Sequence, residues 1–395
     1  MENVFSKIQE HIDNGLYQGL EWKINYKKNI FQGKIGYSDL TTKSLVKENS
    51  IYRIWSMTKP IISIVILQLI EEKKIKFEDS LNYFLPVFND LKVLKKDFNS
   101  IHDVENVKNM PTIKNLLLHT AGFSYNFLGD IIGEKYHQVG LFHSEKTTLE
   151  EEIDLLATIP LLYEPEKKWV YSVSIDILAR IIEVVTGNTL QEELKKRIFK
   201  PLGMIDTGFI INEENNYRLM KSYHYDSIKK KLIDPLTHPR KISNYGYPAD
   251  RTTFARGGIG LFSTVNDYSK FAQMLLSGKA ENNQIIISNT MLKLATTNQI
   301  SSAFLPYEIK NFDLKKIDEN LFEPYGFGYG FRVMMNLQNK IEFGSIGEFG
   351  WGGAASTFFL VDPSNDLTAV LMTQVFEGDP ILLKDFIKII YKNLE

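Results

Sequence analysis

The first forty residues of the chain contain one segment with the hydrophobic pattern of a helix, followed by two segments typical of strands. Residues 4–14 place apolar side chains three and four positions apart, which predicts an amphipathic helix. Residues 19–26 and 30–37 are rich in β-branched and aromatic side chains and flank a short polar turn. This pattern predicts two strands joined as a hairpin.

The last sixty residues repeat this pattern in reverse order. Strands are predicted over residues 340–343, 356–361 and 367–373, and a closing helix is predicted over residues 380–394. Terminal helices with strands at both ends predict one antiparallel sheet built from both ends of the chain, with the middle inserted.

The middle of the chain is predicted to be largely helical. Ser174 is positioned to cap a helix that runs through Thr186, and Thr264 is positioned to cap another that runs through Ser277. A glycine follows each of these helices directly, as is typical of helix C-termini.

We therefore expect an α/β protein of the α+β kind that forms a single domain over residues 1–395. The sheet part is expected over about 1–74 and 201–395, and the helical insertion over about 75–200. Neither an internal repeat nor a low-complexity linker interrupts the sequence.

Composition limits the function classes. The 395 residues are 44% hydrophobic and 24% charged, with a net charge of −2, which is typical of a globular protein and gives no electrostatic reason to expect nucleic acid as a partner. The short lysine run at 229–231 is expected to be a solvated hairpin tip. The sequence does not predict an oligomeric state.

Other classes are disfavoured by what the chain lacks. It has no cysteine, so disulfides, thiolate metal sites and a cysteine nucleophile are excluded. No pair of its seven histidines has the spacing of a zinc protease. The first residues do not resemble a signal peptide, and the longest apolar run, 61–70, is too short to span a membrane. We expect a cytoplasmic protein without a metal or organic cofactor and without a membrane partner.

Ser-x-x-Lys, a motif of nucleophilic serines, occurs three times, at Ser44, Ser56 and Ser227. Only Ser56 opens a long apolar helix, where a spacing of three brings Lys59 onto the same helical face. A desolvated lysine with a lowered pKa can accept the serine proton. The motif alone is equally typical of a surface cap beside a solvated lysine.

Five ordered segments resemble class C β-lactamase-like serine hydrolases, over nearly the whole chain. They are residues 51–60, 116–122, 171–172, 201–207 and 257–264. The resemblance implies a β-lactamase/DD-peptidase-like fold, with Ser56 as nucleophile and Lys59 as base. It also implies that Tyr171 relays the proton to the leaving group.

Two departures from the β-lactam-recognising pattern indicate the substrate class. The family's Tyr-x-Asn is replaced by Tyr171-Ser172-Val173, and its Lys-Thr-Gly is absent. Trp351-Gly352-Gly353 stands instead and resembles family VIII carboxylesterases, as does the segment 171–176. We therefore expect a short-chain carboxylic ester as the small-molecule substrate.

The resemblance also suggests the groups around the substrate. The oxyanion donors are expected to be the N–H of Ser56 and an N–H near Ala354, with Trp351, Gly352 and Gly353 beside the substrate. Aromatic and apolar side chains are candidates for an acyl pocket: Tyr125, Phe127, Val173, Phe349 and Trp351.

Three alternatives stay open on the sequence alone. One is a β-lactamase or D-amino-acid peptidase, another is an acyltransferase, and a third is an inactive scaffold on the same fold. A dinucleotide-binding protein is disfavoured because a strand rather than a helix is predicted after Gly350-x-Gly352. No Gly-x-Ser-x-Gly elbow is present, which argues against an α/β-hydrolase.

Overall fold

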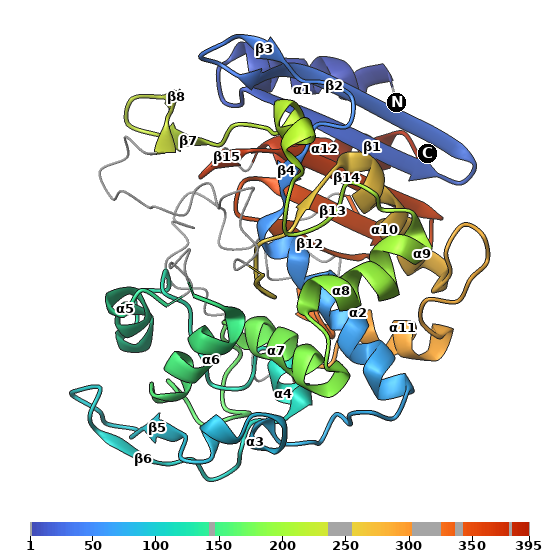
Figure 1. Ribbon diagram of the computed structural model, residues 1–395. Helices are drawn as coiled ribbons and strands as arrows, with labels where there is room; N and C mark the ends of the chain where they lie inside the picture. The colour runs from blue at the N-terminus through green and yellow to red at the C-terminus, as the bar shows by residue number, and fades with distance from the viewer. Residues whose placement is uncertain are drawn as a thin grey trace.

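The computed structural model describes residues 2–141, 147–235, 255–301, 325–335, 343–378 and 381–394. Its described residues contain an eight-stranded sheet in which both ends of the chain meet (Figure 1). In spatial order the strands are β10 (Tyr325–Phe327), β11 (Arg332–Met334), β12 (Phe349–Gly353), β13 (Thr357–Asp362), β14 (Leu367–Thr373), β1 (Gly19–Tyr26), β2 (Asn29–Asp39) and β3 (Ser44–Leu45).

The pairing of β1 with β14 joins the two ends of the chain. Leu20 lies opposite Thr373 and Tyr26 lies opposite Leu367, in antiparallel register. The predicted sheet from both ends is thereby confirmed, and β14 has the bounds that the sequence predicts. The predicted strand 340–343 lies outside the described residues except for Phe343, which is in a bend.

Helices cover both faces of this sheet. The terminal helices α1 (Glu2–Asp13) and α12 (Ile381–Lys392) pack on each other and on one face. They enclose a hydrophobic cluster with Leu20, Leu360 and Leu371. Helix α10 (Val265–Ser277) packs on the other face, against β1, β13 and β14.

The helices between β3 and β9 form a second, helical half of the molecule, and α3 to α7 are drawn below the sheet in Figure 1. Its helices are α2 (Thr58–Glu71), α3 (Leu81–Phe84), α4 (Ile113–Leu117), α5 (Ile131–Gln138), α6 (Leu149–Ala157), α7 (Ser174–Thr186), α8 (Leu190–Leu194) and α9 (Lys200–Leu202). Helix α11 (Asn289–Ala295) follows α10. The remaining strands form three small sheets: β4 (Tyr52–Arg53) with β9 (Phe262–Ser263), β5 (Lys92–Leu94) with β6 (Val104–Asn106), and β15 (Val375–Phe376) with β7 (Tyr223–Asp226) and β8 (Lys231–Ile233).

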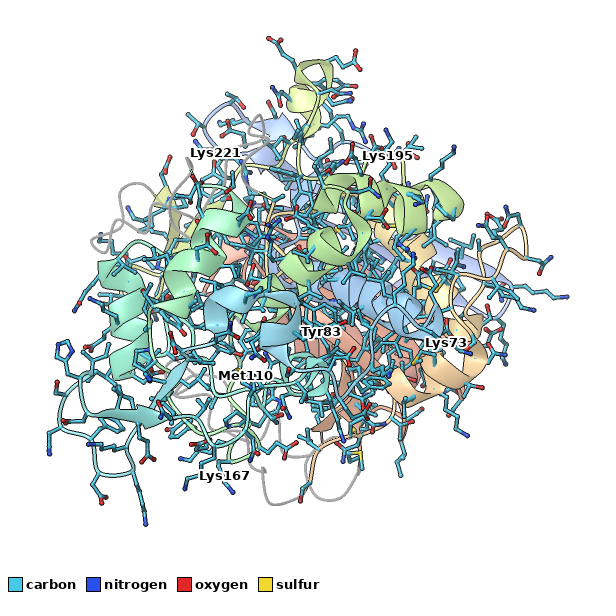
Figure 2. All side chains as sticks on the ribbon, turned by 60° about the horizontal axis from the view of Figure 1, so that its bottom comes forward. Lys73, Tyr83, Met110, Lys167, Lys195 and Lys221 are labelled. Atoms are coloured by element: carbon cyan, nitrogen blue, oxygen red, sulfur yellow. The ribbon has the colours of Figure 1, made fainter. Side chains whose placement is uncertain are left out.

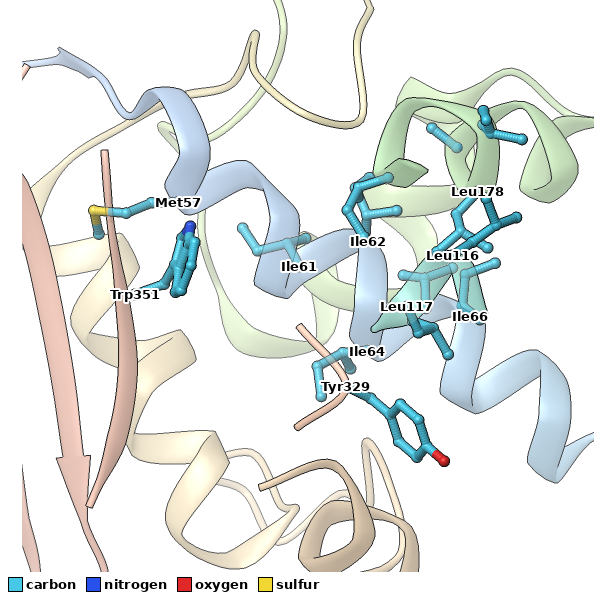
Figure 3. Close-up of a cluster of buried hydrophobic side chains, with 14 of the residues drawn as sticks. Met57, Ile61, Ile62, Ile64, Ile66, Leu116, Leu117, Leu178, Tyr329 and Trp351 are labelled. Atoms are coloured by element: carbon cyan, nitrogen blue, oxygen red, sulfur yellow. The ribbon is translucent and has the colours of Figure 1, made fainter. Parts of the chain in front are cut away.

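Helix α2 lies at the centre because it is apolar all round its surface. Every side chain from Thr58 to Leu69 is buried, as expected of a helix without a polar face. Ile62 and Ile66 point toward Leu116 of α4 and Leu178 of α7 (Figure 3). The core around α2 includes residues of both the sheet and the helical half. The single-domain assignment stays a prediction, and this shared core supports it.

The surface of the helical half is polar. Charged side chains such as Lys73, Lys167 and Lys195 are exposed and lie at the periphery (Figure 2). None of the helices within the described ranges is long and apolar enough to cross a membrane.

Two predicted helix caps have different outcomes. The hydroxyl of Thr264 accepts a hydrogen bond from the Asp267 N–H and caps α10, as predicted. The Ser174 cap is wrong, because Val173 occupies the cap position of α7 without a side-chain hydrogen bond. The Ser174 hydroxyl lies 2.8 Å from the Ser172 hydroxyl instead.

Candidate active site

Ser56 lies in a 3₁₀ turn, Trp55–Met57, that leads directly into α2. The Met57 N–H donates to the Ile54 carbonyl at 3.0 Å and closes the turn. Ser56 is half-buried, whereas Trp55 and Met57 on either side of it are buried. The turn thus leaves the serine as the accessible member of an otherwise enclosed segment.

The side chain of Lys59 approaches the Ser56 hydroxyl from the first turn of α2. Its Nζ lies 3.2 Å from Ser56 Oγ and donates to the Gly258 carbonyl at 2.7 Å. Burial lowers the pKa of Lys59 to about 7, and the negative charge of Asp176 opposes that decrease. An amine with this pKa is substantially neutral at physiological pH, so its lone pair can accept a proton from serine.

Tyr171 lies just before α7 and brings a third polar group to the site. Its ring centroid is 4.7 Å from Lys59 Nζ. The phenol oxygen is buried and makes no hydrogen bond with the described residues. Burial raises the pKa of Tyr171, while interactions with Ser56 and Trp351 act in the opposite direction. A buried hydroxyl beside Ser56 that has no partner among the described residues could bond a ligand that enters the site.

Asp176 is a site residue that the sequence analysis did not single out. Its side chain is buried in the first turn of α7 and accepts the Gly258 N–H at 2.8 Å. Burial raises the pKa of Asp176, and the Lys59 charge opposes this. Gly258 therefore bonds to both side chains, since its carbonyl accepts a hydrogen bond from Lys59 and its N–H donates one to Asp176.

Gly258 has to be a glycine for a geometric reason. A Cβ at this position would lie 2.4 Å from Asp176 Oδ2 and 2.5 Å from the Tyr125 hydroxyl. Two signals in the sequence could have indicated these residues: the glycine pair at 257–258 and the acid five positions after Tyr171.

His119 is a second residue that sequence reasoning did not assign to the site. Its ring centroid lies 4.9 Å from that of Tyr171. Burial and the Lys59 charge hold the pKa of His119 well below its usual value. Its Nδ1 accepts the Ser172 N–H at 3.3 Å, so His119 is a neutral ring behind the tyrosine.

Strand β12 carries the Trp-Gly-Gly segment past the serine turn. The ring of Trp351 lies 5.5 Å from that of Tyr171. Gly353 is required by packing, because a Cβ there would lie 2.5 Å from the Ile54 carbonyl oxygen. Gly352 is less crowded, and Ala354 is exposed directly after the strand. The absence of a side chain at 353 lets the serine turn approach the end of β12.

The candidate pocket residues fall into two groups. The rings of Tyr125 and Phe127 stack with their centroids 4.7 Å apart, and the ring centroid of Tyr125 lies 5.3 Å from that of Tyr171. Phe127 is 41% exposed. Val173 and Phe349 are 0% and 1% exposed and belong to the core. Their side chains are enclosed by protein and are not surfaces that a substrate can touch.

The other two Ser-x-x-Lys motifs lie on the surface. Ser44 is in the exposed edge strand β3, and Ser227 is in the exposed turn between β7 and β8. Within the ranges that the structure describes, no group of three or more histidine and acidic side chains could hold a metal ion. His143 and His238 lie outside those ranges.

The arrangement of the sheet, the central α2 and the Ser56–Lys59 pair is that of serine enzymes related to β-lactamases. The chain belongs to the beta-lactamase family, whose model matches residues 22–392.

Curated relatives cover most of the chain. Esterase EstB of Burkholderia gladioli is 24% identical over 88% of this chain and 84% of its own length. The lovastatin esterase of Penicillium rubens is 28% identical over 80% of this chain and 77% of its own.

Solved structures share the fold. EstCE1, described as a hydrolase with promiscuous acyltransferase activity, has a TM-score of 0.80 at 24% identity and covers 98% of this chain and 97% of its own. A penicillin-binding protein homologue from Pyrococcus abyssi has a TM-score of 0.69 at 20% identity, over 98% of this chain and 76% of its own. The predicted fold class and family are confirmed.

Proposed function

We propose that this protein is a serine hydrolase that cleaves short-chain carboxylic esters through an acyl-enzyme on Ser56. The observation that carries the proposal is the buried Lys59 amine, 3.2 Å from Ser56 Oγ, with its pKa lowered to about 7. The two surface Ser-x-x-Lys pairs lack this desolvation, because Ser44, Lys47, Ser227 and Lys230 are all exposed.

In the acylation step, the neutral Lys59 amine takes the proton of Ser56 as Oγ bonds to the ester carbonyl carbon. The carbonyl oxygen becomes an oxyanion and accepts hydrogen bonds from the N–H groups of Ser56 and Ala354. Tyr171 donates its proton to the alkoxide as the ester bond breaks, and the Lys59 ammonium returns a proton to Tyr171. An alcohol leaves, and the acyl group stays on Ser56.

In the deacylation step, water attacks the acyl carbonyl carbon and gives up a proton to the Lys59–Tyr171 pair. Ser56 recovers its proton as the carboxylic acid leaves. Asp176 balances the positive charge that Lys59 carries in each half of the cycle, because the backbone of Gly258 bonds to both side chains in the same enclosed region.

The nucleophile assignment is tested with Ser56→Ala. We expect loss of esterase activity and of fluorophosphonate labelling, with thermal stability nearly unchanged because Ser56 is half-buried. Ser44→Ala and Ser227→Ala are matched controls that should keep both activity and labelling. A covalent label that mass spectrometry maps to another serine would refute the assignment.

Substrate choice is tested by comparing p-nitrophenyl butyrate with a chromogenic cephalosporin. The amide and the lysine of β-lactam-recognising relatives are both missing, since Val173 is buried in the core and Trp351 stands in the region of the lysine. Each polar group of a bound β-lactam that is left unpaired costs about 1–3 kcal/mol. We expect kcat/KM for the ester to be at least ~10²-fold higher. Equal turnover of the two substrates would favour a β-lactamase instead.

Acyl transfer to an alcohol is the second candidate, since the same acyl-enzyme serves both reactions. The fold that this chain shares with EstCE1, described as a hydrolase with promiscuous acyltransferase activity, is the observation that favours testing it. Vinyl butyrate with increasing concentrations of a primary alcohol separates the two reactions. Hydrolysis predominates if butyrate remains the main product, whereas an acyltransferase makes the new ester even when water is in excess.

A further inference from the structure

The residue directly before the nucleophile has an unusual backbone conformation. Trp55 has φ of +48°, in the left-handed region where a bulky side chain is rare. Such a conformation persists only where the surrounding structure holds it, and it is frequent at functional sites. The cause of the conformation at Trp55 therefore has to lie in its contacts.

The indole ring of Trp55 is held by an aromatic neighbour from the far end of the chain. It packs edge-on against Phe376 of β15, with ring centroids 5.0 Å apart and an angle of 84° between the rings. Both side chains are only 6% exposed. They belong to a small hydrophobic cluster separate from the main core: Ile51, Trp55, Ile211, Phe262, Ala355 and Phe376.

This cluster lies between the two groups to which the proposed function assigns the oxyanion. Ser56 follows Trp55 directly, and Ala354 precedes Ala355, which is completely buried in the cluster. Ala355 is also tied to the Phe376 strand, because its carbonyl accepts the Val375 N–H at 3.2 Å. The ring of Trp55 thus connects the chain at 56 with the chain at 354.

The backbone before Trp55 is held from two further sides. The Ile54 N–H donates to the Leu261 carbonyl at 3.0 Å. The Ile54 carbonyl oxygen lies so close to Gly353 that a Cβ there would come within 2.5 Å of it. These contacts fix the backbone of Ile54 on the N-terminal side of Trp55. The packing of the indole then determines the direction of the backbone from Trp55 to Ser56.

We propose that Trp55 is a positioning residue for the oxyanion hole: its indole, packed in the cluster with Phe376 and Ala355, sets the distance between the N–H groups of Ser56 and Ala354. This inference rests on the proposed function. The oxyanion exists only after attack, so a displaced donor weakens the transition state and leaves substrate binding unchanged. The expected signature is a lower kcat at constant KM.

The principal variant is Trp55→Gly, because glycine adopts a positive φ without strain and only the ring is lost. We expect kcat for p-nitrophenyl butyrate to fall roughly 10- to 100-fold, as a displacement of about 1 Å would cause. KM should stay within about twofold, and the rate of fluorophosphonate labelling should fall in parallel, because the phosphonyl oxygen uses the same donors.

Three further variants separate positioning from general loss of packing. Trp55→Phe keeps an edge-on ring and should restore most of kcat. Phe376→Leu removes the ring partner without touching the strained residue and should lower kcat in the same direction, with an effect that is not additive with Trp55→Gly. Phe88→Leu is the matched control, because Phe88 forms another buried edge-on pair, with Phe123, 6.1 Å apart at 83°; it should keep kcat.

The outcomes are distinct from those that test the proposed function. If Ser56→Ala keeps activity, the proposed function is wrong. If Ser56→Ala is inactive while folded Trp55→Gly keeps its kcat, only the positioning role is wrong. Loss of kcat in Phe88→Leu equal to that in Phe376→Leu would also overturn it. Should Trp55→Gly fail to fold, an unchanged kcat in Phe376→Leu would refute the inference by itself.

Discussion

Two buried polar clusters on either side of β12 use the same kinds of side chain for different purposes. The site cluster contains Lys59, Tyr171 and Asp176 beside Ser56. The second, here called the Tyr391 cluster, consists of Arg332, Glu348, Asp362 and Tyr391, all buried. Glu348 directly precedes β12, and Tyr391 lies on α12, which covers the sheet face opposite α10.

The difference between the two tyrosines is hydrogen-bond satisfaction. The Tyr391 hydroxyl lies 2.6 Å from Glu348 Oε2 and 2.8 Å from Asp362 Oδ2. Burial and these two carboxylates raise the pKa of Tyr391 strongly, so its proton is held in place. The Tyr171 hydroxyl has no carboxylate partner among the described residues, and the side chains that act on it to lower its pKa are those of Ser56 and Trp351.

This comparison indicates that residue type does not distinguish a catalytic cluster from a structural one. A donor without a partner next to a half-buried serine indicates a catalytic role, whereas a donor shared by two carboxylates indicates a structural role. The following changes test that distinction from both sides.

The largest effect is expected from Tyr171→Phe. Removing a positioned proton donor should lower kcat by roughly 10²–10⁴-fold, and Lys59→Ala should do the same. The double variant should lose little more than either single one, since the two groups act as one unit. Steady-state kinetics measure this, and an unchanged kcat in Tyr171→Phe would remove the tyrosine from the mechanism.

Asp176→Asn should change the pH dependence of the reaction. The reactive form needs a neutral Lys59, so kcat/KM of the wild type should rise with pH through about 7. The Asp176 charge raises the pKa of Lys59, so its loss should move this rising limb to lower pH, by about 1–3 units. A limb that stays in place or moves to higher pH would contradict the coupling through Gly258.

Tyr391→Phe is the structural counterpart of Tyr171→Phe. It leaves Glu348 and Asp362 without their shared donor, and an unsatisfied buried acceptor costs about 1–3 kcal/mol. Urea unfolding should show that loss while kcat stays within about twofold. A large decrease in kcat without loss of stability would mean that the two clusters are not separate in function.

Glu21→Gln should have the smallest effect on kcat, which should stay unchanged, and it sharpens the comparison with a carboxylate that has donors but no adjacent catalytic group. Burial raises the pKa of Glu21 to about 7, against the hydrogen bonds of Tyr52 and Ser50. Both donors reach the same oxygen, Oε2, which the Gln oxygen can replace.

The sign of the Glu21→Gln effect follows from proton linkage. Between the unfolded pKa of 4.5 and about 7 the folded state binds more protons than the unfolded state, so the contribution of Glu21 is lost as pH rises. The neutral variant should be more stable than the wild type well above pH 7, by about 3 kcal/mol for a shift of this size, and equal to it below pH 4.5. A variant that is less stable at pH 8 would contradict this sign.

Much of the fold follows from the period of hydrophobic residues near the ends of the chain. Strands β1 and β14 have the predicted bounds because their side chains are buried in a regular pleat. Thr264 caps α10 as predicted, because that hydrogen bond is local. The hairpin of β5 and β6 was missed inside a segment predicted to be largely helical, since both strands are only three residues long.

Residue spacing indicated only the members of the candidate site that are close in sequence, whereas Tyr171 and Trp351 were proposed from the family resemblance. Ser56 and Lys59 are three residues apart, so the helix period brings them together. Asp176 and Gly258 are separated by 82 positions, and no local pattern indicates that the backbone of Gly258 bonds to both Asp176 and Lys59. The positive φ of Trp55 cannot be predicted from the hydrophobic pattern either.

The sequence by itself determined the family, the sheet from both chain ends and the serine–lysine pair, because these depend on short-range spacing and on ordered motifs. The tertiary structure decided which polar groups are desolvated and which are satisfied. Burial lowers the pKa of Lys59, the packing around Tyr171 gives its hydroxyl no partner among the described residues, and Val173 and Phe349 lie in the core. Desolvation depends on every neighbour in space, and those neighbours come from segments that lie far apart along the chain.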